Sequence, residues 1–162
     1  MPGLFDIKVK DLGLRDRLKR ADKLSTANLT VGMERIGRRW LQLVEQGFKE
    51  ERDPYGNSWE PLAKRTIRKK RKLGYRHPEA ILQASGQMRR SFSFYATSRS
   101  VTIYNNRAAF PDGTDVDIHQ TGGQGEFRIP ARPMVPFRDD LPDEWFDAAQ
   151  NAITYALGRY MA

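Results

Sequence analysis

Apolar residues recur at steps of three and four between residues 27 and 50, and this is the strongest pattern in the chain. They are Leu29, Met33, Ile36, Trp40, Leu43, Val44 and Phe48. The residues on the other side are charged or amidic, and they are Glu34, Arg35, Arg38, Arg39, Gln42 and Glu45. In a helix with 3.6 residues per turn, this spacing gathers the apolar side chains on one face. We therefore predict a long amphipathic helix over residues 27–50 that supplies the core.

Weaker patterns predict shorter elements on both sides of this helix. Residues 5–10 alternate apolar and polar like a short strand, and residues 12–24 have the composition of a surface helix. Residues 91–97 and 100–105 alternate like two strands joined by a tight turn. A short helix is expected around residues 80–84.

The C-terminal third combines an irregular stretch with a second amphipathic helix. A loop rich in Gly, Asp and Asn covers residues 105–125, and three prolines between residues 127 and 137 favour an edge strand or an irregular arm. A final helix is expected from Leu141-Pro142, because proline suits the first helical position and the acidic residues after it suit the helix dipole. Its predicted apolar face is Trp145, Phe146, Ala149, Ile153, Ala156, Leu157 and Tyr160.

These elements predict the α+β class, with the long helix and the C-terminal helix packed on a small antiparallel sheet. The very basic residues 61–73 would form a helical or loop insertion in that fold. A chain of 162 residues fits one domain. We expect an N-terminal strand and helix extension over residues 1–25 and a single domain over residues 26–162.

Composition narrows the classes of partner and chemistry. Lys and Arg number 28 against 20 Asp and Glu, and the resulting charge of +8 favours polyanionic neighbours such as nucleic acid or an acidic protein surface. The chain has no cysteine, which excludes disulfides, thiolate metal sites and a cysteine nucleophile. It has no signal-peptide pattern and no apolar run of about 20 residues, so we expect a soluble protein made in a cytoplasm, with no membrane partner.

Patterns that would indicate catalysis or cofactor binding are weak. The two histidines, His77 and His119, are far apart and lack the spacing of metal ligands. The glycine-rich residues 122–125 lack the Lys followed by Ser or Thr that a phosphate-binding loop requires. We therefore predict no catalytic, cofactor or metal site, and the sequence disfavours an enzyme.

The segment between residues 61 and 73 concentrates positive charge without any acidic residue. Its cations are Lys64, Arg65, Arg68, Lys69, Lys70, Arg71 and Lys72. Wound as a helix, the segment would carry positive charge around most of its circumference and could neutralise several phosphates. It could also dock on an acidic neighbouring subunit. No helix-turn-helix, zinc finger or ribbon motif indicates sequence-specific DNA reading, so both kinds of partner stay open.

Three stretches together resemble a known family. The first covers residues 48–62, and its landmarks are Pro54, Tyr55, Gly56, Trp59 and Leu62. The second covers residues 81–92 and places Gly86 just before a strand. The third joins Ile118-His119-Gln120-Thr121-Gly122 to Ile129-Pro130-Ala131-Arg132-Pro133. In this order and at these spacings, they resemble the phage virion-morphogenesis family of tail-completion proteins, found in Mu-like and P2-like phages.

The resemblance covers residues 27–138 and has one departure. Relatives often carry an aromatic–alanine pair before the histidine, whereas this chain has Asp115-Val116-Asp117-Ile118. Contacts at that edge are therefore expected to differ from those of the relatives.

The residues of the first and third motifs can be explained physically. Proline fixes φ and glycine allows a positive φ, so Pro54-Tyr55-Gly56 should reverse the chain sharply after the long helix. Trp59 and Leu62 can then fold back on that helix. The prolines of residues 129–133 would stiffen an extended arm, from which Arg132 could pair with a carboxylate of a neighbouring subunit.

The resemblance implies a structural role without cofactors. Such proteins form rings, often hexamers, that finish a tail tube and let it join the filled head, and DNA passes through the lumen. The expected partners are further copies of the chain, head-completion proteins, and tail tube or terminator proteins. The expected location is the virion neck and, during assembly, the host cytoplasm.

The predicted interface residues are those of the third motif. They are His119, Gln120, Ile129, Arg132 and Pro133. Core packing of Ile129 and Val135 is an equal alternative to an interface role. Two other functions remain open, namely a basic DNA-binding or packaging accessory protein that forms no ring, and a tail-associated nuclease or hydrolase.

Overall fold

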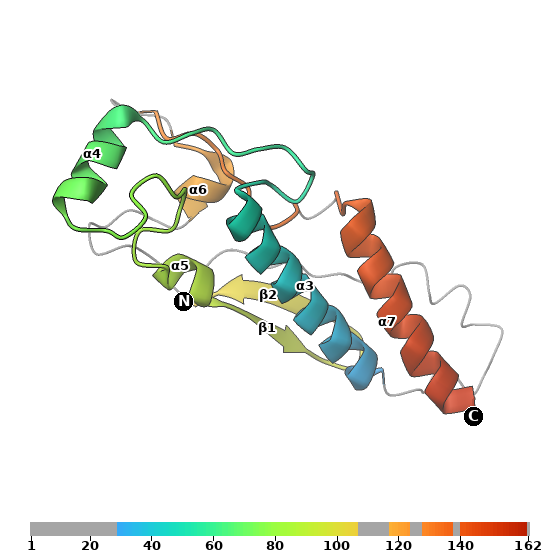
Figure 1. The fold of residues 1–162 in the computed structure, drawn as a ribbon. Helices are drawn as coiled ribbons and strands as arrows, with labels where there is room; N and C mark the ends of the chain where they lie inside the picture. The colour runs from blue at the N-terminus through green and yellow to red at the C-terminus, as the bar shows by residue number, and fades with distance from the viewer. Residues whose placement is uncertain (1–28, 107–116, 124–127, 138–139, 162) are drawn as a thin grey trace.

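The computed structural model describes residues 29–106, 117–123, 128–137 and 140–161 (Figure 1). The elements of these ranges are α3 (Thr30–Glu50), α4 (Lys64–Lys72), α5 (Gln87–Arg90), β1 (Phe92–Ala96), β2 (Val101–Asn105), α6 (Asp117–Thr121) and α7 (Asp143–Met161). Within the described residues, five helices accompany one two-stranded antiparallel sheet, so the α+β class is confirmed. The strand predicted over residues 5–10 and the helix predicted over residues 12–24 lie outside the described residues.

Helix α3 is the centre of the core, and its apolar face is the predicted one. Its buried residues are Gly32, Met33, Ile36, Gly37, Trp40, Leu43, Val44 and Phe48. Leu29 precedes the helix and packs against the same core. The helix ends where Glu51 adopts the left-handed conformation, with φ of 53°, and the Arg52 N–H donates to the Gly47 carbonyl at 3.1 Å. This hydrogen bond closes the helix in the manner of a Schellman motif.

The hairpin β1–β2 covers one side of α3, and α7 covers another (Figure 1). Two glycines of α3 make these approaches close. A Cβ at Gly37 would lie 2.2 Å from Cδ2 of Phe94 in β1, and a Cβ at Gly32 would lie 3.0 Å from the Cβ of Ala156 in α7. Because carbon atoms in contact lie about 3.5–4.0 Å apart, only glycine fits the Gly37 position without displacing the hairpin.

The predicted hairpin is confirmed, and its register places one face against α3. Phe94 pairs with Ile103 and Ala96 with Val101 in the antiparallel ladder. The Thr97 hydroxyl holds the turn, because it accepts hydrogen bonds from the N–H groups of Arg99 and Ser100. Side chains alternate across a strand, so the apolar residues of both strands face the core together.

The predicted C-terminal helix is present as α7, but it begins at Asp143, so Pro142 precedes it and does not occupy its first position. Trp145 anchors it to α3, because the Trp40 indole N–H donates to the Trp145 carbonyl at 3.0 Å and the two rings lie 5.7 Å apart. The buried residues are Trp145, Ala149, Ala152, Ile153 and Ala156. The placement of Phe146 on the apolar face was wrong, because this side chain is 39% exposed, one residue out of step with the buried stripe. The Tyr160 side chain lies outside what the structure describes.

The short helix predicted over residues 80–84 is also wrong, and the helix of this region is α5. Residues 80–84 form successive turns that are tied to the end of α3. The Ile81 N–H donates to the Glu51 carboxylate at 2.7 Å, and the Gln83 amide donates to the Phe48 carbonyl at 2.7 Å. These tertiary hydrogen bonds outweigh a weak helical propensity. Helix α5 starts only after Gly86, which has φ of 71°.

Candidate functional site

The turn after α3 reverses the chain as predicted. Both oxygens of the Asp53 carboxylate stabilise it, since one accepts from the N–H groups of Tyr55 (2.9 Å) and Asn57 (2.8 Å) and the other from the Asn57 amide (3.0 Å). Gly56 has a φ of 89°, which favours glycine at that position. Backbone bridging between Arg52 and Ser58 completes the reversal.

Trp59 follows this turn and folds back on α3, which confirms the second expectation for the motif. Its ring meets the Phe48 ring edge-on at a centroid distance of 5.4 Å, and its indole N–H donates to the Pro133 carbonyl at 3.0 Å. Leu62 packs half-buried against the same core. Trp59 therefore links the first motif to the third.

Arg132 lies inside the subunit rather than on an exposed arm. Its side chain is 4% exposed, and its Nε and Nη2 donate to the Glu60 carbonyl oxygen at 3.0 and 2.8 Å. These acceptors are backbone carbonyls of the same chain, not the carboxylate of a neighbour. Burial lowers the pKa of the Arg132 guanidinium, against the opposing effects of Glu60 and Glu51. The predicted pairing of Arg132 is thus corrected, because the chain folds Glu60 onto it.

Gln120 joins the two halves of the third motif. Its buried side-chain amide donates to the Val135 carbonyl at 2.7 Å, and its amide oxygen accepts from the Met134 N–H at 2.8 Å. The Arg132 N–H donates to the His119 carbonyl at 2.6 Å, and Gly123 pairs with Ile129 in an isolated bridge. Hydrogen bonds therefore hold residues 128–137 against α6 and the core, and this segment does not form a projecting arm.

Ile129 and Pro133, which were also predicted for an interface, lie in this hydrogen-bonded segment. Ile129 and Pro133 are partly buried, and Pro133 receives the Trp59 hydrogen bond. Whether any of this motif contacts a neighbouring subunit stays a prediction. In the isolated subunit, the described contacts give the motif an internal role, which is to hold residues 117–137 against α3.

Helix α4 carries its positive charge on one side rather than around its circumference, which corrects the prediction. Thr66, Ile67 and Lys70 form its inner side, and Lys70 is buried with its Nζ donating to the Ala80 carbonyl at 2.6 Å. Burial lowers the pKa of the Lys70 ammonium, while Glu51 and Glu79 act in the opposite direction. The exposed cations are Lys64, Arg65, Arg68, Lys69, Arg71 and Lys72.

The end of α4 is rigidly defined. The Tyr75 N–H donates to the Lys70 carbonyl at 3.1 Å and the Gly74 N–H to the Arg71 carbonyl at 3.0 Å, and Gly74 has φ of 75°. This is the hydrogen-bond pattern of a Schellman motif. The Arg71 guanidinium also pairs with Glu79. Within this ordered end, the Leu73 side chain is 62% exposed.

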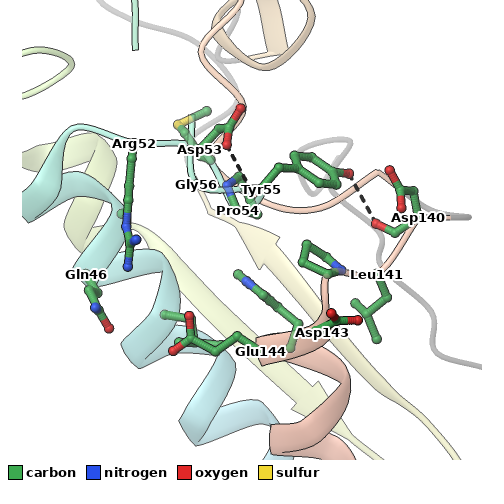
Figure 2. A pocket seen from close by; sticks show the side chains of 15 residues that line it. Gln46, Arg52, Asp53, Pro54, Tyr55, Gly56, Asp140, Leu141, Asp143 and Glu144 are labelled. Atoms are coloured by element: carbon green, nitrogen blue, oxygen red, sulfur yellow. Dashed lines mark hydrogen bonds between the residues drawn. The ribbon is translucent and has the colours of Figure 1, made fainter. Parts of the chain in front are cut away.

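A pocket of about 480 Å³ lies between the end of α3, the turn after it and the start of α7. Figure 2 shows Gln46, Arg52 and the turn residues on one side, and Asp140, Asp143 and Glu144 on the side that leads into α7. The Tyr55 hydroxyl bridges the two sides, because it donates to the Asp140 carbonyl at 3.1 Å and accepts from the Phe137 N–H at 2.9 Å. The Tyr55 side chain therefore ties the turn after α3 to the segment that leads into α7.

All three motifs lie within the part of the chain that matches a known family. The model of the Phage virion morphogenesis family matches residues 9–154. The chain belongs to this family. Neither a curated protein nor a solved structure shows a significant match to it. The resemblance that the motifs carried is thereby confirmed, and the match also extends into α7 as far as residue 154, which the motifs alone did not cover.

Family membership gives this virion morphogenesis protein a structural role in the phage. Among the described residues, no group of three or more His, Cys, Asp or Glu residues could hold a metal ion. None of the described helices is long and apolar enough to cross a bilayer. The candidate functional features of the part of the chain in view are surfaces, namely the outer side of α4 and the pocket beside α7.

The basic residues of α4 were predicted from the sequence, whereas the pocket beside α7 and the exposed Leu73 were not. Asp143 and Glu144 carried a signal, but acidic residues in the first turn of a helix are already favoured by the helix dipole. Only the fold shows that Asp140, Asp143 and Glu144 also border a pocket with Asp53 and Tyr55, which are more than 80 residues away in sequence.

Proposed function

We propose that this protein is a non-enzymatic structural subunit of the phage neck, where it forms a ring that completes the tail and allows the head to join. The observation that carries the proposal is the family match over residues 9–154, which spans the described core. The three motifs support it, because the contacts of Trp59, Gln120 and Arg132 hold them on one core. The outer side of α4 and the pocket beside α7 are surfaces on which partners can dock.

The proposed partners follow from this position in the virion. Further copies of the chain would form the ring, and a hexamer is the expected size. Head-completion proteins would meet one end of the ring, and tail tube or terminator proteins the other. Phage DNA would pass through the lumen, where a chain with a charge of +8 meets no repulsion.

A second candidate function is a DNA-binding or packaging accessory protein that forms no ring. The specific observation in its favour is the outer side of α4, whose six exposed cations occur with no acidic residue in the helix. Contacts between such a side and phosphates release counterions, so binding would weaken steeply with salt. The candidate requires a monomer, which separates it from the ring.

Native mass spectrometry of the purified chain, with and without a short DNA duplex, decides between the two candidates. A ring subunit should give a closed oligomer, expected at six times the 18.7 kDa chain mass, whether or not DNA is present. An accessory protein should remain a monomer alone and gain mass only with the duplex. A monomer in both samples would contradict the ring.

A further inference from the structure

We propose that α4 of one subunit docks into the pocket beside α7 of the next, so that this single contact, repeated head to tail, closes the ring. The inference rests on the proposed ring. It assigns a partner to the outer side of α4 and to the pocket, and it commits to one occupant of the pocket, namely a second copy of this chain.

The docking element is the outer side of α4 together with Leu73. Lys64, Arg68 and Lys72 follow one another at four-residue steps and form a stripe about 12 Å long. Leu73 follows Lys72 at the Schellman-closed end, about a quarter turn further round the helix axis, as a large exposed apolar side chain beside the stripe. An apolar tip next to a row of cations is a shape that fits an apolar hollow with an acidic border.

The pocket has those two properties. Buried apolar side chains, including Leu43, Met134 and Trp145, form its floor. Among the described residues that line it, four carry carboxylates, namely Asp53, Asp140, Asp143 and Glu144, and one, Arg52, carries a guanidinium. The Arg52 guanidinium is paired with Glu50 at 2.6 Å. Glu144 is paired with Arg39 at 3.4 Å and Asp53 holds the turn, so Asp140 and Asp143 are the carboxylates that the proposal assigns to the guest. The pocket therefore favours a cationic, partly apolar guest.

The volume suits this guest. At about 480 Å³ the pocket is in the range of small-molecule sites, which is enough for a leucine side chain and the ends of one or two long cationic side chains. Lys and Arg can lay their methylene stems on apolar surface while their charged ends reach the border carboxylates.

The two surfaces cannot meet within one subunit. Figure 1 shows α4 at the far side of the domain from the start of α7, with α3 and the segment after it in between. A contact between two different surfaces of identical chains is heterologous, and such contacts generate a ring when the rotation closes. Because the α4 of the same subunit cannot reach the pocket, the proposed occupant is the α4 of a neighbouring subunit.

Charge reversal on each side provides the test. The first variant carries Lys64→Glu, Arg68→Glu and Lys72→Glu. The second carries Asp140→Lys and Asp143→Lys. It leaves Asp53 unchanged because Asp53 holds the turn, and it leaves Glu144 unchanged because Glu144 pairs with Arg39. Each variant should weaken assembly on the order of a hundredfold in dissociation constant, as measured by sedimentation velocity, because like charges would face each other at the contact. Leu73→Ser should weaken it without any change of charge.

Mixing the two reversed variants is the most decisive of these experiments. A negative α4 then meets a positive pocket, and a positive α4 meets a negative pocket, so rings should form again from alternating subunits. A chain that carries both reversals should also assemble alone. Arg99→Glu, at the exposed hairpin turn, is the matched control and should assemble like the unmodified chain.

Four results would overturn the inference. Rings that persist in both reversed variants would show that other surfaces build the ring, and would leave the proposed function standing. Loss of assembly in both variants with no recovery on mixing would show that the two surfaces do not face each other. Loss of duplex DNA binding in the α4 variant, with unchanged assembly, would assign α4 to DNA. A monomeric unmodified chain would remove both the inference and the ring on which it rests.

Discussion

Arg132 is a buried cation that serves backbone carbonyls of its own subunit. The guanidinium reaches the Glu60 carbonyl across 72 positions of sequence and so fixes the segment after Trp59 to the segment after α6. A buried donor group that is hydrogen-bonded in this way costs stability when it is removed, since the carbonyl it served is left unsatisfied.

Arg132→Ala is therefore expected to lower the free energy of unfolding by about 2–3 kcal/mol. Urea denaturation followed by tryptophan fluorescence measures this change. Arg128→Ala is the matched control, because the Arg128 side chain is 80% exposed and should contribute less than about 0.5 kcal/mol. An Arg132→Ala chain with unchanged stability and lost assembly would return this residue to a subunit interface.

Trp40 is the second residue on which the core depends. It is completely buried, its ring lies tilted beside the Trp145 ring, and its indole N–H donates to the Trp145 carbonyl. Trp40 thus couples α3 to α7. Trp40→Ala should cost about 3–5 kcal/mol through lost contacts and the cavity left behind. Thermal unfolding by circular dichroism checks this, with Tyr95→Ala on the exposed side of β1 as the control that should barely shift the midpoint.

At the scale of elements, the hydrophobic pattern predicted what local sequence decides. The three- and four-residue steps from Leu29 to Phe48 predicted α3, and the alternation on both sides of Thr97 predicted the hairpin, because helices and strands have fixed periods. The missed elements depend on distant contacts. Residues 80–84 are held in turns by Glu51 and Phe48, and α6 is a single short turn whose Gln120 is set by the backbone of Met134 and Val135.

The same distinction applies to the candidate site. The turn at Pro54-Tyr55-Gly56 was predictable because proline and glycine restrict their own backbones. The partner of Arg132 was not, because no local signal brings Glu60 to it. The pocket was also beyond prediction, since its two sides meet only when α7 packs against α3.

Gly37 tests the packing of elements directly. Gly37→Ala in α3 should lower the free energy of unfolding by about 1–3 kcal/mol, because the new Cβ would strike the Phe94 ring and push β1 away. Gly158→Ala in α7 is the matched control, since a Cβ there meets open space and should stabilise the helix by up to about 1 kcal/mol. Equal effects of the two substitutions in denaturant melts would contradict the close approach of α3 and β1.

At the scale of the whole molecule, one domain presents two surfaces of opposite charge at separate places. The outer side of α4 is basic and the border of the pocket is acidic, within a chain whose net charge is +8. Membership of the Phage virion morphogenesis family gives these surfaces a context, because an assembly protein acts through contacts rather than through chemistry. The central claim is that the contacts complete the tail and let it join the head.

Electron microscopy of a lysate from the phage with this gene deleted tests that claim most directly. Filled heads and separate tails are expected, with joined virions restored when the chain is supplied from a plasmid. Heads without DNA would instead favour a packaging accessory protein. Normal, infectious virions from the deletion would contradict the account.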